Sequence, residues 1–331
     1  MVVALPWLAL SVPSLDHALE SQLQRAFAKF AVGHTDPLHH LTARVTSDGL
    51  GAPDEARSLA AAANASFQFV VGRETPEAAR YATADGSVVR VDFRNGELQL
   101  TLNEAVFDAP YSTWADLCAA PLAATWRYHG YVPLHAAAVS LDEHSVLVVG
   151  ASGSGKTTTS LALATGDGVW RADDKVLLRE TPDGFEAASL YANTNLAPAT
   201  IAAHAPLAFA LERPPINDTN DKRACQLDEL GHRVDFSPFR PSAVVFPRQV
   251  DRDRSSLHRL STVDSVVRLA AQSPTGGDRA SLRRQHGQLV ALATGVPAWE
   301  LEAGRDVLFD PVSFTTTLRR TLADAATDAP A

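Results

Sequence analysis

Apolar and polar residues alternate in short runs over residues 1–110. Three of these runs show the period-two pattern of half-buried strands: 66–71, 87–93 and 98–102. The pairs Asp85-Gly86 and Asn95-Gly96 lie between them, and such pairs favour tight hairpin turns. The pattern predicts an antiparallel, β-rich N-terminal unit, with a helix over residues 15–31 inside it or beside it.

After residue 110 the apolar segments are longer and alternate between helix and strand character. A helix is expected over 113–127, and continuous apolar runs predict buried strands. These runs are 134–139, 145–149, 169–178 and 243–246. Three further helices are expected, from residue 262, around 281–294 and around 311–323. The first of them carries Val263, Val266, Val267 and Ala270 on one face. We therefore predict an α/β chain with a β-rich domain over 1–110, a second domain over 111–324 and a frayed tail over 325–331.

Composition narrows the class of protein. The 331 residues are 46% hydrophobic and 20% charged, which suits an ordinary globular core. The net charge of −9 has no basic stripe, which argues against nucleic acid as a main partner. Two cysteines form neither a disulfide framework nor a metal pattern, and no apolar run is long enough to span a membrane. The apolar start fits a first strand better than a signal peptide, so we expect a cytoplasmic protein without a membrane partner.

The motif with the most specific chemistry is Gly150-Ala-Ser-Gly-Ser-Gly-Lys-Thr157, a complete P-loop pattern. An apolar strand precedes it and a helical segment follows, which is the context in which loop N–H groups and the helix dipole face an anion. Lys156 is expected to reach the β- and γ-phosphates, and the Thr157 hydroxyl to ligate Mg²⁺. The other residues expected to contact the nucleotide are Gly150, Ser152, Gly153, Ser154, Gly155 and Thr158. The sequence predicts ATP and Mg²⁺ as ligands.

A second candidate lies sixteen residues after Thr157, where Asp173-Asp174 interrupts an apolar run. Adjacent carboxylates on a strand point to opposite faces, so one could face the nucleotide and the other a metal or the backbone. A metal ligand and a general base are both needed for phosphoryl transfer to a hydroxyl. The alternative is a surface β-turn, in which Asp-Asp is common. His135, fifteen residues before Gly150, is a further candidate beside the usual structural role of a lone histidine.

These residues resemble a known family. His135 in Leu134-His-Ala-Ala-Ala-Val139, the P-loop and Ala172-Asp173-Asp174 resemble, in residues and spacing, the C-terminal kinase domain of HPr kinase/phosphorylase. They are closer still to HPr-kinase-like proteins of peptide-modification gene clusters, including the lasso-peptide kinases. The similarity is specific over about 115–180, weaker to about 310, and limited to β-richness in the N-terminal unit. It implies a P-loop domain of the HPr kinase and PEP carboxykinase type, with a mixed sheet and flanking helices.

The resemblance also implies roles. Asp173 becomes the general base, Asp174 a metal-binding or base-supporting carboxylate, and His135 a neighbour of the pair. Lys222 and Arg223 are the nearest counterparts of a basic loop that contacts phosphate. HPr kinases are hexamers, so a homo-oligomer is one possibility, but the sequence carries no oligomerisation signature and leaves the oligomeric state open. The family's later signature, with a metal-binding Glu, has no counterpart that we can place, and Glu186 is an unaligned candidate.

The predicted function is therefore an ATP-dependent, Mg²⁺-dependent kinase that phosphorylates a hydroxyl. The expected acceptor is Ser or Thr of a small protein or ribosomal peptide. A kinase of a small metabolite is the alternative among enzymes, and a nucleotide-gated regulator of a biosynthetic cluster is the alternative outside them. The sequence leaves the acceptor, the reverse reaction and the division of roles between Asp173 and Asp174 open.

Overall fold

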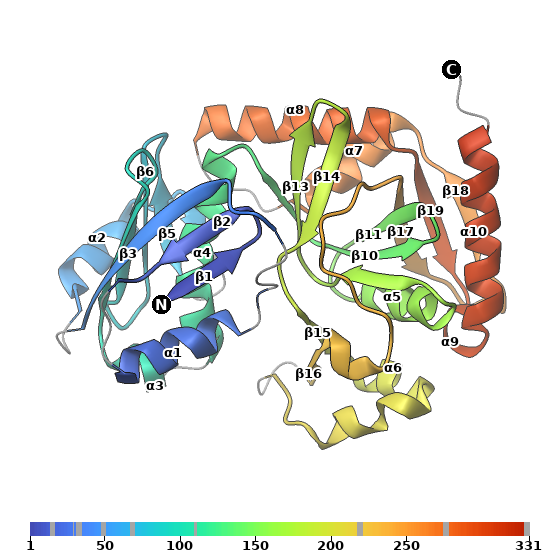
Figure 1. Cartoon of the computed structure of the whole chain (residues 1–331), viewed down its shortest axis with the longest axis horizontal. Helices are drawn as coiled ribbons and strands as arrows, with labels where there is room; N and C mark the ends of the chain where they lie inside the picture. The colour runs from blue at the N-terminus through green and yellow to red at the C-terminus, as the bar shows by residue number, and fades with distance from the viewer. Residues whose placement is uncertain are drawn as a thin grey trace. The chain divides into compact units, whose positions relative to one another are not determined.

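The computed structural model describes residues 1–13, 17–28, 30, 35–47, 51–66, 70–108, 111–216, 221–273 and 278–327. Two compact units are present (Figure 1). Unit 1 comprises Met1–Pro133 and Thr275–Gly287, and unit 2 comprises Leu134–Pro274 and Gln288–Ala331. The domain boundary proposed at residue 110 stays a prediction, and the compact units divide the chain elsewhere. One reason is that helix α4 (Tyr111–Tyr128) packs on the strands of unit 1, with Trp126 Nε1 donating to Pro6 O at 2.9 Å.

Unit 1 is built on a single eight-stranded sheet in the order β1-β2-β3-β8-β7-β6-β5-β4. Its remaining elements in chain order are β1 (Val2–Leu5), β2 (Leu8–Ser11), α1 (His17–Phe27), β3 (His39–Ser47), α2 (Pro53–Ala61), β4 (Ala65–Ser66), β5 (Val71–Glu74), β6 (Ala78–Ala82), β7 (Val88–Asp92), β8 (Glu97–Leu102) and α3 (Ala105–Asp108). The pairs β2–β3 and β3–β8 are parallel, and the other neighbours are antiparallel. The predicted β-rich character of this part of the chain is confirmed, whereas the prediction of a purely antiparallel arrangement is wrong, because β3 pairs in parallel with both β2 and β8.

The two predicted hairpin turns join β6 to β7 and β7 to β8. Gly86 and Gly96 have φ values of 93° and 64°, a left-handed conformation that residues with a Cβ rarely adopt. Strand β8 alternates as the sequence indicated, with Leu98, Leu100 and Leu102 buried. The centre of the strand predicted over 66–71 lies outside the described residues.

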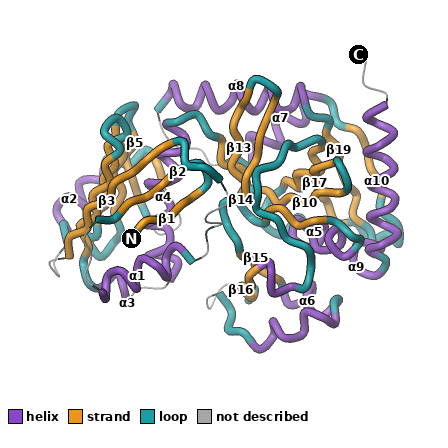
Figure 2. Tube along the Cα trace, in the orientation of Figure 1, coloured by secondary structure: helices purple, strands orange, loops and turns teal. Residues whose placement is uncertain are grey.

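Unit 2 contains a six-stranded mixed sheet in the order β12-β10-β11-β17-β19-β18 (Figure 2). Its strands are β10 (Ala136–Leu141), β11 (His144–Val149), β12 (Val169–Ala172), β17 (Ala243–Gln249), β18 (Ser256–Arg259) and β19 (Ala298–Ala303). Strand β11 is parallel to β17, and β17 to β19, whereas β10 pairs antiparallel with both β11 and β12. The predicted α/β class with a mixed sheet and flanking helices is confirmed.

Two smaller sheets and several helices complete unit 2. One sheet contains β13 (Val176–Thr181) and β14 (Gly184–Ser189) and has three strands, and the other consists of β15 (Asn193–Leu196) and β16 (Arg223–Gln226). The helices are α5 (Lys156–Thr165), α6 (Pro198–Ala203), η1 (Ala205–Glu212), η2 (Leu227–Leu230), α7 (Thr262–Ala271), α9 (Asp306–Phe309) and α10 (Pro311–Thr327). Strand β9 (Val132–Leu134) and helix α8 (Arg279–Gly295) contain residues of both units.

The core of unit 2 lies between the mixed sheet and the helices α5 and α10. Val146 and Val148 of β11 are buried with Leu161 of α5 and Leu318 of α10. Helix α5 contacts β10 and β11, and α10 packs on α5 (Figure 1). This packing fixes the first turn of α5 against the end of β11.

Three sequence-based expectations for unit 2 require correction or adjustment. The strand predicted over 169–178 is broken into β12 and β13 by a bend at 173–175. Helix α7 turns Ser265 and Leu269 inward and leaves Val263 72% exposed, so its valines do not form the core face. Helix α10 continues through Thr327, three residues into the segment expected to fray, because its alanine-rich end favours helix.

Candidate functional site

The P-loop connects the C-terminal end of β11 to the N-terminus of α5, as the motif requires. Its glycines are needed for steric reasons: a Cβ on Gly150 would lie 2.4 Å from Ser154 Oγ, and Gly155 has a φ of 101°. The loop therefore curls tightly before the first turn of α5. The four N-terminal N–H groups of that helix have no intrahelical partner, which makes this end suitable for an anion.

Lys156 lies back across the loop. Its Nζ donates to Gly150 O at 2.7 Å and to Ala151 O at 3.0 Å, and the residue is only 6% exposed. Burial lowers the pKa of Lys156 to about 8, although the charges of Asp174 and Asp173 oppose that shift. The ammonium group is thus held by backbone carbonyls beside the cavity, where a phosphate could take their place.

Asp173 and Asp174 lie at the bend between β12 and β13, and both line the cavity that the P-loop lines. The expectation that they point to opposite faces of a strand is wrong, because Asp174 has a φ of 64° and the chain turns there. Lys175 N donates to Asp173 O at 2.8 Å and stabilises this turn. The bend brings the two carboxylates to one side of the cavity.

The Asp173 carboxylate is buried, with 1% of the residue exposed. Thr157 Oγ1 lies 3.3 Å from Oδ1 and 3.2 Å from Oδ2, and Thr194 Oγ1 donates to Oδ2 at 2.5 Å. Burial raises the pKa of Asp173 to about 6, and the two hydroxyl donors only partly offset it. This carboxylate therefore has an unusual affinity for a proton or a cation.

Asp174 is held differently from its neighbour. His135 Nε2 lies 3.1 Å from Asp174 Oδ1, and 36% of the Asp174 side chain is exposed. Burial alone would raise the pKa of Asp174, but the His135 hydrogen bond and the nearby positive charge of Lys175 outweigh it and hold that pKa well below its usual range. The backbone N–H of His135 donates to Gln272 O at 2.8 Å, which fixes the histidine next to α7.

The cavity has a volume of about 190 Å³. The residues expected from the sequence that line it are His135, Ser152, Gly153, Gly155, Lys156, Thr157, Thr158, Asp173, Asp174 and Lys222. Gly150 and Ser154 shape the loop without lining the cavity, and Arg223 Nη1 instead donates to Asp221 O at the start of β16. Glu186 pairs with Arg179 on the β13–β14 hairpin and does not line the cavity.

The structure adds residues that sequence reasoning missed. Asn195, Ala197, Ala199, Thr200 and Gln249 line the cavity, and Thr194 reaches it through Asp173. Gln249 ends an apolar strand, which is a signal that could have found it. Thr194 and Asn195 carry no sequence signal, because polar residues on a short strand are usually solvated.

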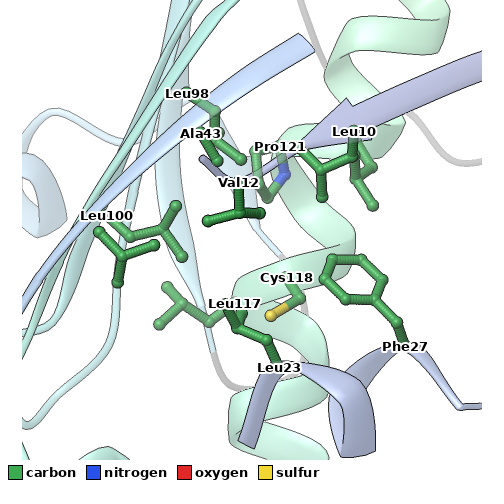
Figure 3. A pocket seen from close by; sticks show the side chains of 12 residues that line it. Leu10, Val12, Leu23, Phe27, Ala43, Leu98, Leu100, Leu117, Cys118 and Pro121 are labelled. Carbon is green, nitrogen blue, oxygen red and sulfur yellow. The ribbon is translucent and has the colours of Figure 1, made fainter. Parts of the chain in front are cut away.

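A second cavity lies in the core of unit 1, between the sheet and the helices α1 and α4 (Figure 3). Its volume is about 10 Å³ and its lining is apolar, including Leu10, Phe27, Leu117 and Cys118. It has space for about one water molecule and offers no polar partner, so it is a packing void rather than a candidate site.

Within the part of the chain that the structure describes, no three His, Cys, Asp or Glu side chains form a cluster that could hold a metal ion. Nor is any helix among the described residues long and apolar enough to cross a membrane.

No protein-family model matches the sequence, and no curated protein matches it. Among solved structures, the chain is similar to the Hpr(Ser) kinase/phosphatase from Coxiella burnetii. The match has 12% sequence identity, covers 59% of this chain and 94% of that chain, and has a TM-score of 0.30. Both the identity and the TM-score are low, so the function is inferred from the residues of the site.

Proposed function

We propose that this protein is a phosphotransferase that moves the γ-phosphate of ATP to a hydroxyl group. One observation carries the proposal: a P-loop and two adjacent carboxylates, of which Asp173 is buried, line the same cavity, and Thr157 of the loop is hydrogen-bonded to Asp173. A phosphate-binding loop, hard oxygen ligands and a proton acceptor are the parts that phosphoryl transfer requires.

The residues present fit ATP and Mg²⁺. The loop is curled so tightly that a Cβ at Gly150 would lie 2.4 Å from Ser154 Oγ, and that hydroxyl oxygen is buried without a hydrogen-bond partner among the described residues. The Thr157 hydroxyl and the aspartate carboxylates are the oxygen ligands that Mg²⁺ prefers, with phosphate oxygens completing its shell. When bound, the ion would neutralise charge on the phosphates. Thr157 and Asp174 are the residues proposed to hold it.

In the proposed reaction, Lys156 leaves its loop carbonyls and binds the β- and γ-phosphates. Asp173 accepts the proton of the acceptor hydroxyl as that oxygen bonds to the γ-phosphorus, and the bond from phosphorus to the β-bridging oxygen breaks. Its raised pKa, about 6, makes Asp173 a better proton acceptor near neutral pH than the strongly acidic Asp174. His135 orients Asp174 through their hydrogen bond.

The contact between Thr157 and Asp173 favours a second assignment of the same two residues. A hydroxyl that ligates Mg²⁺ can donate its proton to a neighbouring carboxylate, which would place Asp173 on the metal side. Asp174, more exposed and paired with His135, would then face the acceptor. The reaction is unchanged, and only the two carboxylates exchange roles.

The acceptor is proposed from the family resemblance: a Ser or Thr hydroxyl of a small protein or ribosomal peptide. A small metabolite is the alternative acceptor. A regulator that binds ATP without transferring phosphate is the alternative outside enzymes, and it would need Mg²⁺ ligation but no base.

Lys222 lines the cavity and is proposed to contact phosphate. The position of Arg223 does not support the same role, because it does not line the cavity and donates to Asp221 O.

Replacing each carboxylate separately tests the proposal. Asp173→Asn should leave ATP binding intact and lower transfer by about 10²- to 10⁴-fold, the contribution of a general base. Asp174→Asn should raise the Mg²⁺ concentration needed for half-maximal rate. Phosphotransfer to peptides and proteins encoded beside this gene, followed by mass spectrometry, measures the first effect, and Mg²⁺ titration measures the second.

Lys156→Ala is the control for the nucleotide site, and it should weaken ATP binding by one to a few kcal/mol, roughly the loss of a charge-assisted contact. Unchanged ATP affinity in that variant would reject the site. ATP binding without transfer to any acceptor offered would favour the regulator, and exchanged phenotypes of the two aspartate variants would favour the second assignment.

A further inference from the structure

Gln249 lies on the opposite side of the P-loop from the two strands that supply the aspartates. It is the last residue of β17, the strand that runs parallel to β11 on the side away from β10. Val148 of β11 is in register with Val245 of β17, so β17 extends past the end of β11 and reaches the level of the loop. Gln249 lines the same cavity as Lys156, Asp173 and Asp174.

The strand alternation directs Gln249 toward α5. Ala243 and Val245, on the same face of β17 as Gln249, are buried in the core with Leu161 of α5. Arg248 points to the other face, where it pairs with Glu300 at 3.2 Å and with Glu302 at 2.6 Å. Arg248 therefore belongs to an ion-pair network on one face of β17, whereas Gln249 lies on the other face and lines the cavity.

The side-chain amide of Gln249 is close to the loop. A Cβ placed on Gly155 would lie 3.6 Å from Gln249 Nε2, so the carboxamide lies beside the start of α5. No hydrogen bond to the Gln249 side chain occurs among the described residues, and the residue is exposed. A carboxamide supplies two N–H donors without charge, which suits a group that meets an anion only when the ligand is bound.

We propose that the Gln249 amide donates a hydrogen bond to the terminal phosphate of bound ATP and so distinguishes ATP from ADP. The inference rests on the proposed function, because it assumes that Lys156 and the loop bind the phosphate chain. The terminal phosphate then lies between Gln249 on one wall and the aspartate pair on the other. A glutamate at this position would repel the same phosphate.

The test compares the affinities for Mg·ATP and Mg·ADP by isothermal titration calorimetry. Gln249→Ala should weaken Mg·ATP binding by roughly 10- to 100-fold, as expected when a hydrogen bond to a charged group is lost. Mg·ADP binding should change by less than about threefold. Gln249→Glu should weaken Mg·ATP binding at least as much, through like-charge repulsion. It keeps the side-chain volume, so it gives the same comparison if the alanine variant is unstable.

Arg248→Gln is the matched control, since it alters the neighbouring residue on the other face and should leave both affinities unchanged. Equal losses for ATP and ADP, or no loss of either in both Gln249 variants, would overturn the inference while the proposed function stands. Failure of the wild-type protein to bind ATP, or wild-type affinity in Lys156→Ala, would instead overturn the proposed function and this inference with it.

Discussion

Two buried carboxylates, one in each unit, are stabilised in opposite ways. In unit 1, Glu74 is 5% exposed and forms an ion pair with Arg127 Nη2 at 2.5 Å, while Tyr81 also donates to it. In unit 2, Asp173 is 1% exposed and accepts hydrogen bonds from the hydroxyls of Thr157 and Thr194. No ion pair to Asp173 occurs among the described residues.

The difference separates a structural charge from a functional one. The carboxylate of Glu74 is neutralised by a cation that belongs to the fold, so binding of a further cation would gain little. The carboxylate of Asp173 accepts hydrogen bonds from hydroxyls and has no ion-pair partner among the described residues. Burial raises its pKa to about 6, and the nearby charge of Lys156 offsets that shift only in part. Such a group is less stable as an anion, and it gains most when a proton or a metal ion arrives.

The largest effect on stability is expected at the ion pair between Glu74 and Arg127. Glu74→Gln leaves the Arg127 charge buried, with 4% of its side chain exposed, and should lower the free energy of unfolding by about 3–5 kcal/mol. Urea denaturation followed by circular dichroism measures it. The double variant Glu74→Leu with Arg127→Met should regain most of the loss, because neither charge remains. A single-variant loss below about 1 kcal/mol would contradict a structural role for this pair.

A smaller effect is expected at Thr194, which connects β15 to the site. Thr194→Val removes a donor to a buried carboxylate and should cost about 1.5–3 kcal/mol of stability. Phosphate transfer should fall about tenfold with an unchanged KM for ATP, because Asp173 is less well oriented. Thr194→Ser keeps the hydroxyl and should restore the rate. If the serine variant is as slow as the valine variant, the hydrogen bond does not orient Asp173.

Substitution of Asp173 should change the free energy of unfolding in the opposite direction. Asp173→Asn removes a desolvated anion and should increase the free energy of unfolding at pH 7.5 by roughly 1–2 kcal/mol while transfer is lost. Because the folded pKa is raised from 3.8 to about 6, the wild-type carboxyl contributes stability that is complete below pH 3.8 and lost as the pH rises through about 6. The increase in the free energy of unfolding of Asp173→Asn over wild type should therefore vanish near pH 4. A destabilised variant at pH 7.5 would show that Asp173 is structural like Glu74.

The smallest effect concerns two stacked histidines in unit 1. The rings of His39 and His129 lie 3.6 Å apart between centroids, and the pKa of His129 is lowered to about 4, first by burial and then by the charges of His39 and Arg284. A lowered pKa gives stability that is complete above about pH 6.5 and lost as the pH falls toward 4.

Melting temperatures between pH 7 and pH 4.5 measure this effect. Since His129 is only half-buried, the loss should be on the order of 1 kcal/mol. His129→Phe should flatten this part of the profile, and His144→Phe, an exchange outside the stack, should not. Identical profiles for wild type and His129→Phe would contradict the assignment.

The sequence alone determined the features that depend on neighbours along the chain. The P-loop was predictable because a strand, its glycines and a helix lie within about twenty residues, and Gly150, Lys156 and Thr157 take their places from that local geometry. The hairpin turns at Gly86 and Gly96 were predictable for the same reason, since only glycine adopts their backbone conformation at little cost.

Only the tertiary structure decided which distant residues join the P-loop. Asp173 and Asp174 were visible in the sequence, but the bend that turns both carboxylates into one cavity depends on β12 and β13 belonging to different sheets. Thr194 and Gln249 come from β15 and β17, 21 residues after Asp173 and 92 residues after Thr157 respectively. Hydrophobic periodicity specifies which face of a strand is buried, but sheet order and register decide which strand ends meet, and these depend on packing over the whole unit.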